Sequence, residues 1–416
     1  RWEFRIVALE EYRTFSSGAF EGSNGDKPSV LYVTNNLPIP PTSGGQLREY
    51  QLLLRLKEYF DIHLVAFVPD IDQASNFVNP ALEFLVSVTF IKTINQLAPA
   101  HTPNRVRAHF APAGKDVVSM LLAKFDPDLV HVEGYFLVHY LPETSCPPVV
   151  LTEENIEYEL EAAGEKYGYY PMGSSQLTQE WEVRVWNRVD QCVAVTDEDR
   201  EIITVVGKLN NVECIPGGMD HLDLNNRPIK RDTNANCTFL YIGNYRWPPS
   251  EDAAWHLLQD IWPVVSEISP HSQLVFAGVG MSDKFVKVAS DASRVIVHGP
   301  FKHLDELMMN TSVFLFPLRF GGGQKMKLVE VIAAGMPVVT TSLALRGFPK
   351  EVVPYLSIVD NEVNSFAEAA IAALNSPRAS ERARYARTTL NLHLPSWDEA
   401  ASLLSQLWFN NLSFDV

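Results

Sequence analysis

The sequence lacks any apolar run that approaches the roughly 18 consecutive residues a transmembrane helix needs. It also has few cysteines: Cys146, Cys192, Cys214 and Cys237 are widely spaced, with no Cys-x-x-Cys pair and no His/Cys group at metal-ligand spacing. The first absence excludes a membrane-spanning helix, and the second argues against a disulfide framework or a cysteine metal site. We interpret the four cysteines as reduced interior thiols of a cytoplasmic protein.

Positive charge is scarce as well. The chain has 34 Lys and Arg against 50 Asp and Glu, which gives a formal net charge of −16. This balance argues against nucleic acid or an anionic membrane as the main partner, although a local basic patch is compatible with it.

An internal repeat of roughly 20 to 50 residues is also missing. With a hydrophobic content of 46%, the composition is that of a soluble globular protein.

The length of the chain indicates how many domains it forms. At 416 residues it is too long for one ordinary core and predicts two domains of roughly 200 residues each. Residues 1–28 mix polar and aromatic side chains, without the basic start and continuous apolar core of a secretion signal. We predict that they form an N-terminal arm or an artificial remnant.

The rest of the chain is organised around residues 314–340. There, a short apolar run is followed by three successive glycines at 321–323 and by an apolar pattern with helical spacing. Gly335 is a typical helix end, Pro337 cannot continue a helix, and Val338 to Thr340 are typical of a buried strand. The stretch therefore predicts a strand, a glycine loop, a helix and a second strand.

This glycine loop suits a phosphate-bearing ligand. Glycines let the backbone approach a ligand closely, and the unpaired amides at the following helix start attract an anion. Lys325 and Lys327 supply positive charge nearby. The alternative is that the glycines form a flexible connection and that Glu330 is a solvated helix residue, because a glycine run before a helix is weak support taken alone.

The N-terminal half begins with the same order of elements. The pattern predicts a strand, a loop rich in Pro and Gly, a helix with one apolar face and a second strand at residues 30–34, 35–45, 46–60 and 62–67. This is the first unit of a parallel Rossmann-like sheet, where ligands bind at the carboxyl ends of strands. Gly44 and Gly45 lie at that end, although a plain turn is the alternative.

Further short apolar segments predict the remaining strands. In the first half they are residues 86–92, 129–132, 149–152 and 191–196, and in the second half 238–242, 273–277, 295–297, 313–316, 337–340 and 356–359. Thr196 or Asp197 is a predicted helix N-cap. Residues 396–407 predict a helix with one apolar face.

The stretch around the glycine loop resembles the C-terminal signature of the retaining glycosyltransferase family usually called family 4. The matching positions are Arg319, Gly321 to Gly323, Lys327, Glu330, Ala334, Gly335, Pro337 and Val338. The N-terminal loop is similar to the same family through Pro40, Pro41, Gly44, Gly45 and Arg48. The resemblance implies the GT-B architecture, an α/β fold in which two Rossmann-like domains face each other across a cleft.

The resemblance covers most of residues 29–410 and implies the domain boundaries. Residues 29–215 are expected to form the N-terminal, acceptor-side domain, and residues 216–395 the C-terminal domain that binds the nucleotide sugar. In the family the last helix returns to the N-terminal domain, so residues 396–416 are assigned to it.

Two positions depart from the family pattern. Many members carry two glutamates on the signature, and Gly322 stands where the first should be, as in a subgroup with a Gly-Gly loop followed by basic residues. After the strand at 149–152, Glu154 occupies the position of a family histidine close to the transferred sugar. Glu154 could orient a sugar hydroxyl or stabilise positive charge at the anomeric carbon. Equally, it could be a solvated carboxylate at a helix start.

The resemblance implies a site with residues from both halves. The candidate catalytic residues are Glu154, Lys327 and Gly45. The candidate donor-binding residues are Gly44, Gly45, Arg246, Gly299, Gly322, Gly323, Gln324, Lys325, Met326, Lys327 and Glu330. Glu330 would bind the ribose hydroxyls, and Gly299 lies in the region that lines the nucleobase pocket in relatives. Arg246 is a candidate phosphate ligand, although a surface role is equally open because the usual lysine is absent.

Asp126-Pro-Asp128 invites comparison with the Asp-x-Asp metal site of a different glycosyltransferase fold. It directly precedes a strand, where Pro and acidic residues commonly form a turn, and the neighbouring markers of that fold are missing. We therefore predict no metal and no cofactor, with a nucleotide diphosphate sugar as co-substrate.

The predicted activity is transfer of a sugar from a nucleotide diphosphate sugar to a hydroxyl acceptor with retention at the anomeric carbon. In the family's usual mechanism the leaving phosphate takes the acceptor proton on the face where the bond breaks, so the protein positions the reactants and stabilises charge. The acceptor is expected to be a soluble glycan, small molecule or protein. Two alternatives stay open: a sugar-nucleotide 2-epimerase of the same architecture, and a catalytically inactive homologue that acts as a binding partner.

Overall fold

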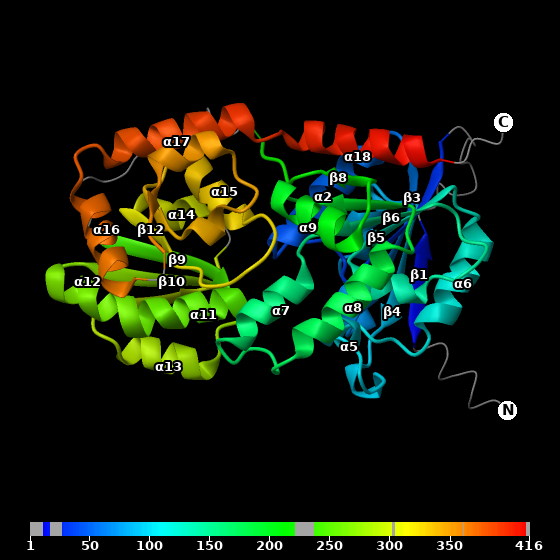
Figure 1. Cartoon of the computed structure of the whole chain (residues 1–416), viewed down its shortest axis with the longest axis horizontal. Coiled ribbons are helices and arrows are strands. Elements are labelled where there is room, and N and C mark those ends of the chain that lie inside the picture. The colour runs from blue at the N-terminus through cyan, green and yellow to red at the C-terminus, as the bar shows by residue number, and fades with distance from the viewer. Residues whose placement is uncertain (1–10, 17–26, 221–236, 302–303, 361, 413–416) are drawn as a thin grey trace. The chain divides into compact units, whose positions relative to one another are not determined.

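A computed structural model describes residues 11–16, 27–220, 237–301, 304–360 and 362–412 of the chain. Contacts divide the chain into two compact units (Figure 1). The N-terminal unit comprises Arg1–Glu165, Tyr170–Gly217 and Trp397–Val416, and the C-terminal unit comprises Lys166–Tyr169 and Gly218–Ser396. The short segment 166–169 thus groups with the C-terminal unit although it precedes the predicted boundary.

The N-terminal unit is built on an eight-stranded sheet of order β1-β4-β3-β2-β5-β6-β7-β8, in which only the β1–β4 pair is antiparallel. Its strands are β1 (Tyr12–Ser16), β2 (Ser29–Thr34), β3 (Asp61–Val68), β4 (Ser87–Lys92), β5 (Leu129–Glu133), β6 (Val149–Glu153), β7 (Gln191–Ala194) and β8 (Val212–Cys214). The sequence did not predict β1. Its five residues are too few and too mixed in polarity to show alternation, and the strand depends on pairing with the edge of β4.

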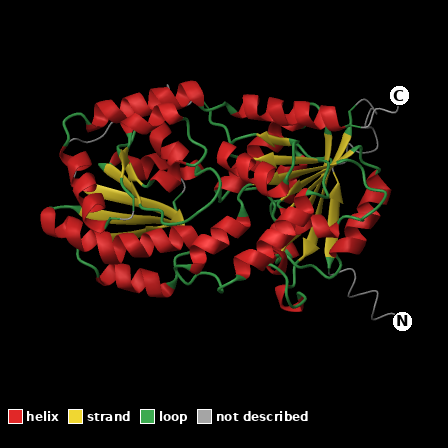
Figure 2. Cartoon of the chain, viewed as in Figure 1, coloured by secondary structure: helices red, strands yellow, loops and turns green. Residues whose placement is uncertain are grey.

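Helices cover both faces of this sheet (Figure 2). They are α2 (Gly44–Leu56), α3 (Ile71–Ser75), α4 (Val78–Leu82), α5 (Asn104–Ala108), α6 (Gly114–Phe125), α7 (Glu157–Glu165), α8 (Ser174–Trp186), α9 (Asp197–Gly207) and α18 (Trp397–Asn411), with the 3₁₀ turns η2 (Asn95–Leu97) and η3 (Tyr135–Tyr140). Thr196 caps α9 as predicted, because its side-chain oxygen accepts a hydrogen bond from the Asp199 amide at 3.0 Å.

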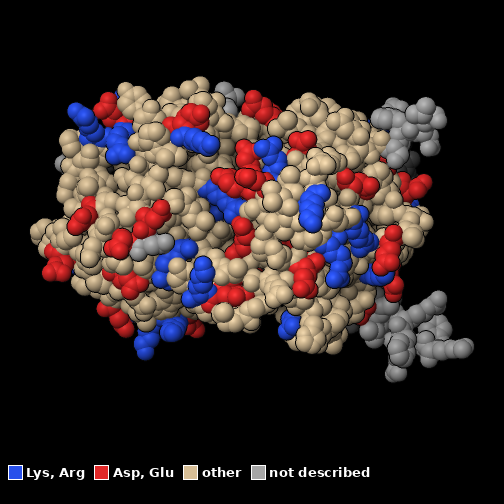
Figure 3. Space-filling view, viewed as in Figure 1, with Lys and Arg blue, Asp and Glu red and all other residues tan. Residues whose placement is uncertain are grey.

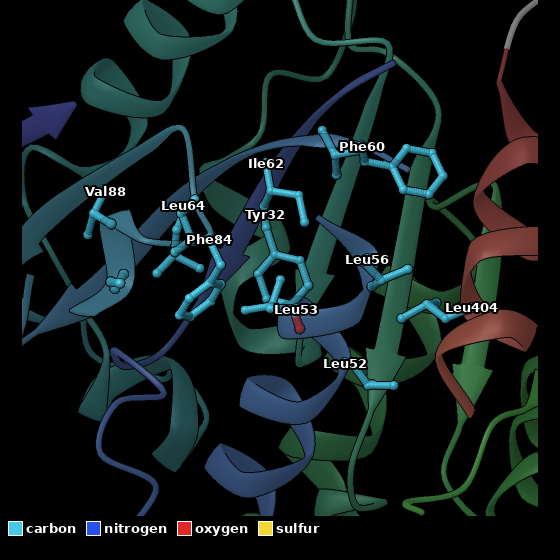
Figure 4. Close-up of a cluster of buried hydrophobic side chains, with 14 of the residues drawn as sticks. Tyr32, Leu52, Leu53, Leu56, Phe60, Ile62, Leu64, Phe84, Val88 and Leu404 are labelled. Atoms are coloured by element: carbon cyan, nitrogen blue, oxygen red, sulfur yellow. The ribbon is translucent and has the colours of Figure 1, made fainter. Parts of the chain in front are cut away.

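Two separate cores lie on the two faces of the sheet. Because successive side chains of a strand point to opposite faces, β2 sends Val30 and Tyr32 into one core and Leu31 and Val33 into the other. The first core is closed by apolar residues of α2 and α18, including Leu404, as Figure 4 shows. The second is closed by α6, η3 and α8. The C-terminal helix is therefore part of the N-terminal core.

The C-terminal unit has a six-stranded sheet of order β11-β10-β9-β12-β13-β14, with every neighbouring pair parallel. Its strands are β9 (Thr238–Asn244), β10 (Gln273–Val279), β11 (Val295–Gly299), β12 (Val313–Phe316), β13 (Val338–Thr340) and β14 (Ser357–Ile358). All six coincide with predicted strands to within a few residues. Two Rossmann-like α/β units with parallel sheets confirm the predicted fold class.

The helices of the C-terminal unit also flank its sheet. They are α11 (Pro248–His256), the π-helical turn η4 (Leu257–Ile261), α12 (Trp262–Ile268), α13 (Asp283–Asp291), α14 (Leu304–Met309), α15 (Met326–Ala333), α16 (Val363–Asn375) and α17 (Ala379–His393), with the 3₁₀ turns η5 (Ser342–Leu345) and η6 (Lys350–Tyr355). The wider turn η4 lies just before Pro263, whose missing amide interrupts the normal ladder of helix hydrogen bonds.

Charged side chains of both signs are interspersed on the surface seen in Figure 3. Within the described residues, we find no helix that combines the length and the apolar character needed to cross a bilayer.

Candidate functional site

The carboxyl edge of the C-terminal sheet carries most of the predicted donor-binding residues. Strands β9, β10 and β11 are in parallel register, with Gly243 opposite Gly278 and Gly299 opposite Ala277. Strand β12 lies on the other side of β9 and leads into the glycine loop. The segments that contain Arg246, Gly299 and the glycine loop therefore leave the sheet at the same edge.

The glycine loop, residues 321–323, is folded against the segment that follows β9. A Cβ placed on Gly321 would lie 3.6 Å from the Trp247 ring and 3.7 Å from Pro249. Gly323 has a φ of 62°, in the left-handed region where a side chain is strained. Gly323 therefore has a backbone conformation that suits a glycine, and the loop packs against the segment after β9.

Lys325 holds the loop from inside. Its side chain is buried, and its Nζ donates hydrogen bonds to the carbonyl oxygens of Gly322 at 2.6 Å and Gly323 at 2.7 Å. Sequence reasoning proposed Lys325 as a positive charge available to a phosphate. The structure instead places its ammonium against two backbone carbonyls.

Helix α15 follows directly and presents the other two charged residues. Its apolar side, including Leu328, Val331 and Ile332, is fully buried. On the more exposed side Lys327 Nζ lies 2.5 Å from Glu330 Oε2, and these side chains are 37% and 34% exposed. The helix ends at Ala333, and Gly335, just beyond its C-cap Ala334, has a φ of 71°. The sequence thus predicted the end of α15 closely but not the Lys327–Glu330 ion pair.

The other predicted donor-site residues of the C-terminal unit lie at the same edge, and their burial differs. Met326 is buried at the start of α15, and Gln324 Nε2 donates to the Gly347 carbonyl at 3.2 Å. Arg246 is exposed, and its side chain lies against Gly280. Gly299 has a φ of 72° with open space beside its Cα.

Arg319 and Phe320 connect the glycine loop to a segment that sequence reasoning missed. Arg319 makes two hydrogen bonds with the Asp252 carboxylate, at 2.8 and 2.5 Å, and its guanidinium lies 4.3 Å from the centre of the Tyr167 ring. Burial lowers the pKa of Arg319, but the bonds to Asp252 outweigh it and raise the pKa. The Phe320 ring stacks on Tyr167 at 5.6 Å and contacts Tyr169 at 5.5 Å. No local pattern around 166–169 indicates this contact.

In the N-terminal unit, Gly45 and Glu154 are brought together. Ser43 caps α2 by accepting the Gln46 amide at 3.2 Å, so Gly44 and Gly45 form the first turn of the helix. A Cβ placed on Gly45 would lie only 2.3 and 2.7 Å from the two carboxylate oxygens of Glu154. The Glu154 carboxylate thus packs against the amino end of α2, where a negative charge is favourable.

The pKa of Glu154 is raised to about 7. Burial of the carboxyl group is the main cause and the negative charge of Glu133 adds to it, while Arg48 and Arg105 oppose the shift. Near neutral pH Glu154 therefore exists in both protonated and ionised forms. Glu154 as a residue is partly exposed but its Oε1 atom is buried, and it precedes α7, which begins at Glu157.

A buried hydrogen-bond network lies next to Glu154. Trp408 Nε1 donates to His131 Nδ1 at 3.1 Å, so a neutral His131 carries its proton on Nε2, which lies 3.0 Å from Glu133 Oε1. Tyr32 donates to the same oxygen at 2.5 Å, and Arg48 Nη1 lies 3.7 Å from it. Burial raises the pKa of Glu133, but these partners bring it below its ordinary value. The network thus connects helix α18 to strands β2 and β5.

Two further glutamates accept hydrogen bonds near Glu154. One of them, Glu182, holds the start of α7, the helix that follows Glu154 in the chain. The Glu182 carboxylate accepts the amides of Glu157 at 2.8 Å and Tyr158 at 3.0 Å. Glu153 accepts from Trp186 Nε1 at 2.9 Å, and burial raises its pKa to about 8. Sequence reasoning missed Glu182, because a cap supplied by another helix leaves no local signal.

The Asp126-Pro127-Asp128 segment has structural roles. Asp126 ends α6 in the left-handed conformation with a φ of 44°, and Asp128 Oδ2 accepts the Ser29 amide at 2.7 Å. Among the described residues, no group of three or more His, Cys, Asp or Glu side chains is arranged to hold a metal ion.

Two family models together match most of the chain. The model described as "Glycosyl transferases group 1" matches residues 236–376, and the model described as "Glycosyltransferase Family 4" matches residues 43–221. The chain carries the two domains of a GT-B glycosyltransferase. The predicted family resemblance is confirmed at this level, whereas retention and the Gly-Gly subgroup stay predictions.

Solved structures with the same fold align over nearly their whole length. Sucrose-phosphate synthase from Thermosynechococcus elongatus has a TM-score of 0.67 and 16% identity, with 92% of this chain and 98% of that chain covered. HepE from Anabaena, in complex with UDP and glucose, has a TM-score of 0.66 and 13% identity, with 92% and 100% covered. At these identities the likeness concerns the fold alone.

One curated relative matches at the sequence level. It is an uncharacterized 44.6 kDa protein in the cps region of Klebsiella pneumoniae, 27% identical over 135 residues, which are 31% of this chain. The match spans 35% of that protein.

Proposed function

We propose that this protein transfers a sugar from a nucleotide diphosphate sugar to a hydroxyl acceptor with retention at the anomeric carbon. The observation that carries the proposal is the arrangement at the carboxyl edge of the C-terminal sheet. There, a glycine loop of defined conformation leads into α15, and Lys327 and Glu330 stand together on the exposed side of that helix. Backbone amides and a lysine suit a diphosphate, and a carboxylate suits the two hydroxyls of a ribose.

In this proposal Glu330 binds the ribose and Lys327 binds the diphosphate. Without a ligand these two side chains neutralise each other at 2.5 Å. A partly exposed ion pair of this kind contributes only about 0–1 kcal/mol. Exchanging it for bonds to ribose and phosphate therefore costs little, and both residues are available to a donor.

We assign Glu154 and Gly45 to the transferred sugar or its acceptor. A carboxyl group whose pKa is about 7 can accept a hydrogen bond from a sugar hydroxyl when ionised and donate one when protonated. Gly45 leaves the space in which this carboxyl group lies. Glu154 would thus fill the place of the family histidine with a different chemical group.

The reaction needs no covalent enzyme intermediate in this proposal. The bond from the anomeric carbon to the leaving phosphate breaks as the acceptor oxygen approaches the same face, and the acceptor proton passes to the departing phosphate oxygen. Lys327 and the loop amides stabilise the charge that develops on the diphosphate. We also propose that the reaction is metal-independent, so activity should persist in EDTA.

Incubation of the full chain with a panel of nucleotide sugars tests the proposal. UDP-sugars come first, because the structure of the relative HepE is described as a complex with UDP and glucose. The expected result is nucleoside diphosphate release, and NMR of the glycoside product should show the donor's anomeric configuration. An inverted product would contradict retention, and an epimerised donor formed without acceptor would support the 2-epimerase instead.

The lack of donor turnover together with a lack of nucleotide binding would contradict the proposal as a whole.

We also propose a cytoplasmic location, which the four free cysteines support because such thiols persist in a reducing compartment. Fractionation of the native host, with the protein detected by antibody, tests the location.

A further inference from the structure

The ammonium group of Lys325 is bound to the backbone of the glycine loop, not displayed to a ligand. Its Nζ lies 2.6 Å from the Gly322 oxygen and 2.7 Å from the Gly323 oxygen, and the residue is only 5% exposed. We propose that Lys325 is a positioning residue: it turns the two carbonyls inward so that the amides of Gly323 and Gln324 point toward the donor diphosphate. This inference rests on the proposed donor site.

The geometry of the peptide bond connects the carbonyls to the amides. In a trans peptide the C=O of one residue and the N–H of the next point in opposite directions. Among the described residues the cis peptide is Ile39–Pro40, so the loop peptides are trans. With the oxygens of Gly322 and Gly323 directed at Lys325, the N–H groups of Gly323 and Gln324 are directed away from it.

The conformation of Gly323 supports the same arrangement. Its φ of 62° belongs to the left-handed region, which is one half of the right-handed and left-handed pair in which successive amides converge on one anion. Two carbonyls turned toward the anion would repel it, since their oxygens carry negative partial charge. Hydrogen bonds to an ammonium are charge-assisted and strong, which makes Lys325 suited to holding both carbonyls away from the anion.

The two lysines of this segment therefore have different roles. Lys327 is 37% exposed on α15 and forms an ion pair with Glu330. An incoming phosphate can therefore compete with Glu330 for the Lys327 ammonium group. Lys325 is enclosed by the loop that it shapes. We expect Lys327 to contact the ligand directly and Lys325 to act through the backbone.

Amide hydrogen exchange in the ligand-free protein tests this role without any donor. Lys325→Met removes the ammonium but keeps a long side chain, Lys325→Arg keeps a cationic donor, and Lys287→Met on the exposed face of α13 is a matched control. Lys325→Met should increase exchange in a peptide spanning 320–327 by about tenfold or more. Lys325→Arg should restore part of the protection, and Lys287→Met should match the wild type.

Affinity for a nucleoside and for its diphosphate gives the second readout. Lys325→Met should weaken binding of the diphosphate by about 10- to 100-fold, the effect of losing bonds of this strength, and leave affinity for the nucleoside within about twofold. Unchanged exchange in Lys325→Met would overturn the inference, as would a donor complex in which Nζ has left both carbonyls for a phosphate oxygen. If the wild type bound no nucleotide while exchange still rose in Lys325→Met, the proposed function would fail and the loop-shaping role would stand.

Discussion

Replacing Gly45 with alanine tests whether this glycine exists to make room for Glu154. Gly45 lies in the first turn of α2, outside the residues with positive φ, so the backbone itself tolerates alanine. The new methyl group, however, would lie 2.3 Å from Glu154 Oε2 and 2.7 Å from Oε1. Ordinary contact begins at about 3.4 Å, so the carboxylate must move by about 1 Å.

The energetic cost follows from where the carboxylate can go. It is the mobile end of a long side chain, but burial and the charges of Glu133, Arg48 and Arg105 limit its alternatives. We therefore expect Gly45→Ala to destabilise the protein by about 1–2 kcal/mol, toward the low end for overpacking. In a Glu154→Ala background the obstacle is gone, and the same change should be neutral or stabilising by up to about 1 kcal/mol through helix propensity.

A double-mutant cycle in urea measures the coupling between the two positions. The wild type, Gly45→Ala, Glu154→Ala and the double variant should give a coupling free energy of about 1–3 kcal/mol. The rate of sugar transfer should show the same dependence, with the double variant no slower than Glu154→Ala. Coupling below about 0.5 kcal/mol, with Gly45→Ala equally harmful in both backgrounds, would refute the idea that Gly45 acts through Glu154.

Three further variants test separate parts of the structure. Glu154→Gln should flatten the pH dependence of stability: the pKa rises from 4.5 to about 7 on folding, so the native state binds the extra proton in that window and loses stability as pH rises through it. An unchanged slope in urea titrations from pH 4 to 8 would contradict this. Trp408→Phe removes the donor to His131 and should cost about 1–3 kcal/mol, whereas Leu403→Ala at an exposed site of the same helix should cost under about 0.5 kcal/mol; equal effects would argue against the network. Gly323→Ala forces a side chain into a φ of 62° and should cost about 1–2 kcal/mol and weaken nucleotide binding, and a variant with wild-type melting temperature and affinity would show that the loop does not need this conformation.

Features set by neighbouring residues could be predicted from the sequence. Helix α15 ends just before Gly335 because a left-handed glycine and Pro337 both stop a helix. Thr196 caps α9 because its hydroxyl reaches an amide three residues ahead. Short apolar runs also identified the parallel strands of both sheets, except β8.

Features set by distant segments could not be predicted. Strand β1 depends on pairing with β4, and the contact between Gly45 and Glu154 joins the first turn of α2 to the segment after β6, more than a hundred residues further along the chain. The partners of a lysine side chain could not be predicted from the sequence either. The sequence indicates that Lys325 and Lys327 are close to a glycine loop, but only the fold shows that one binds backbone carbonyls and the other Glu330.

The most direct test of the central claim is a crystal structure of the full chain with a nucleoside diphosphate bound. The account predicts phosphate oxygens against the amides of residues 322–325 and the Lys327 ammonium, with the two ribose hydroxyls on the Glu330 carboxylate and the Lys327–Glu330 pair opened. A nucleotide bound elsewhere, or a ribose that does not contact Glu330, would contradict it.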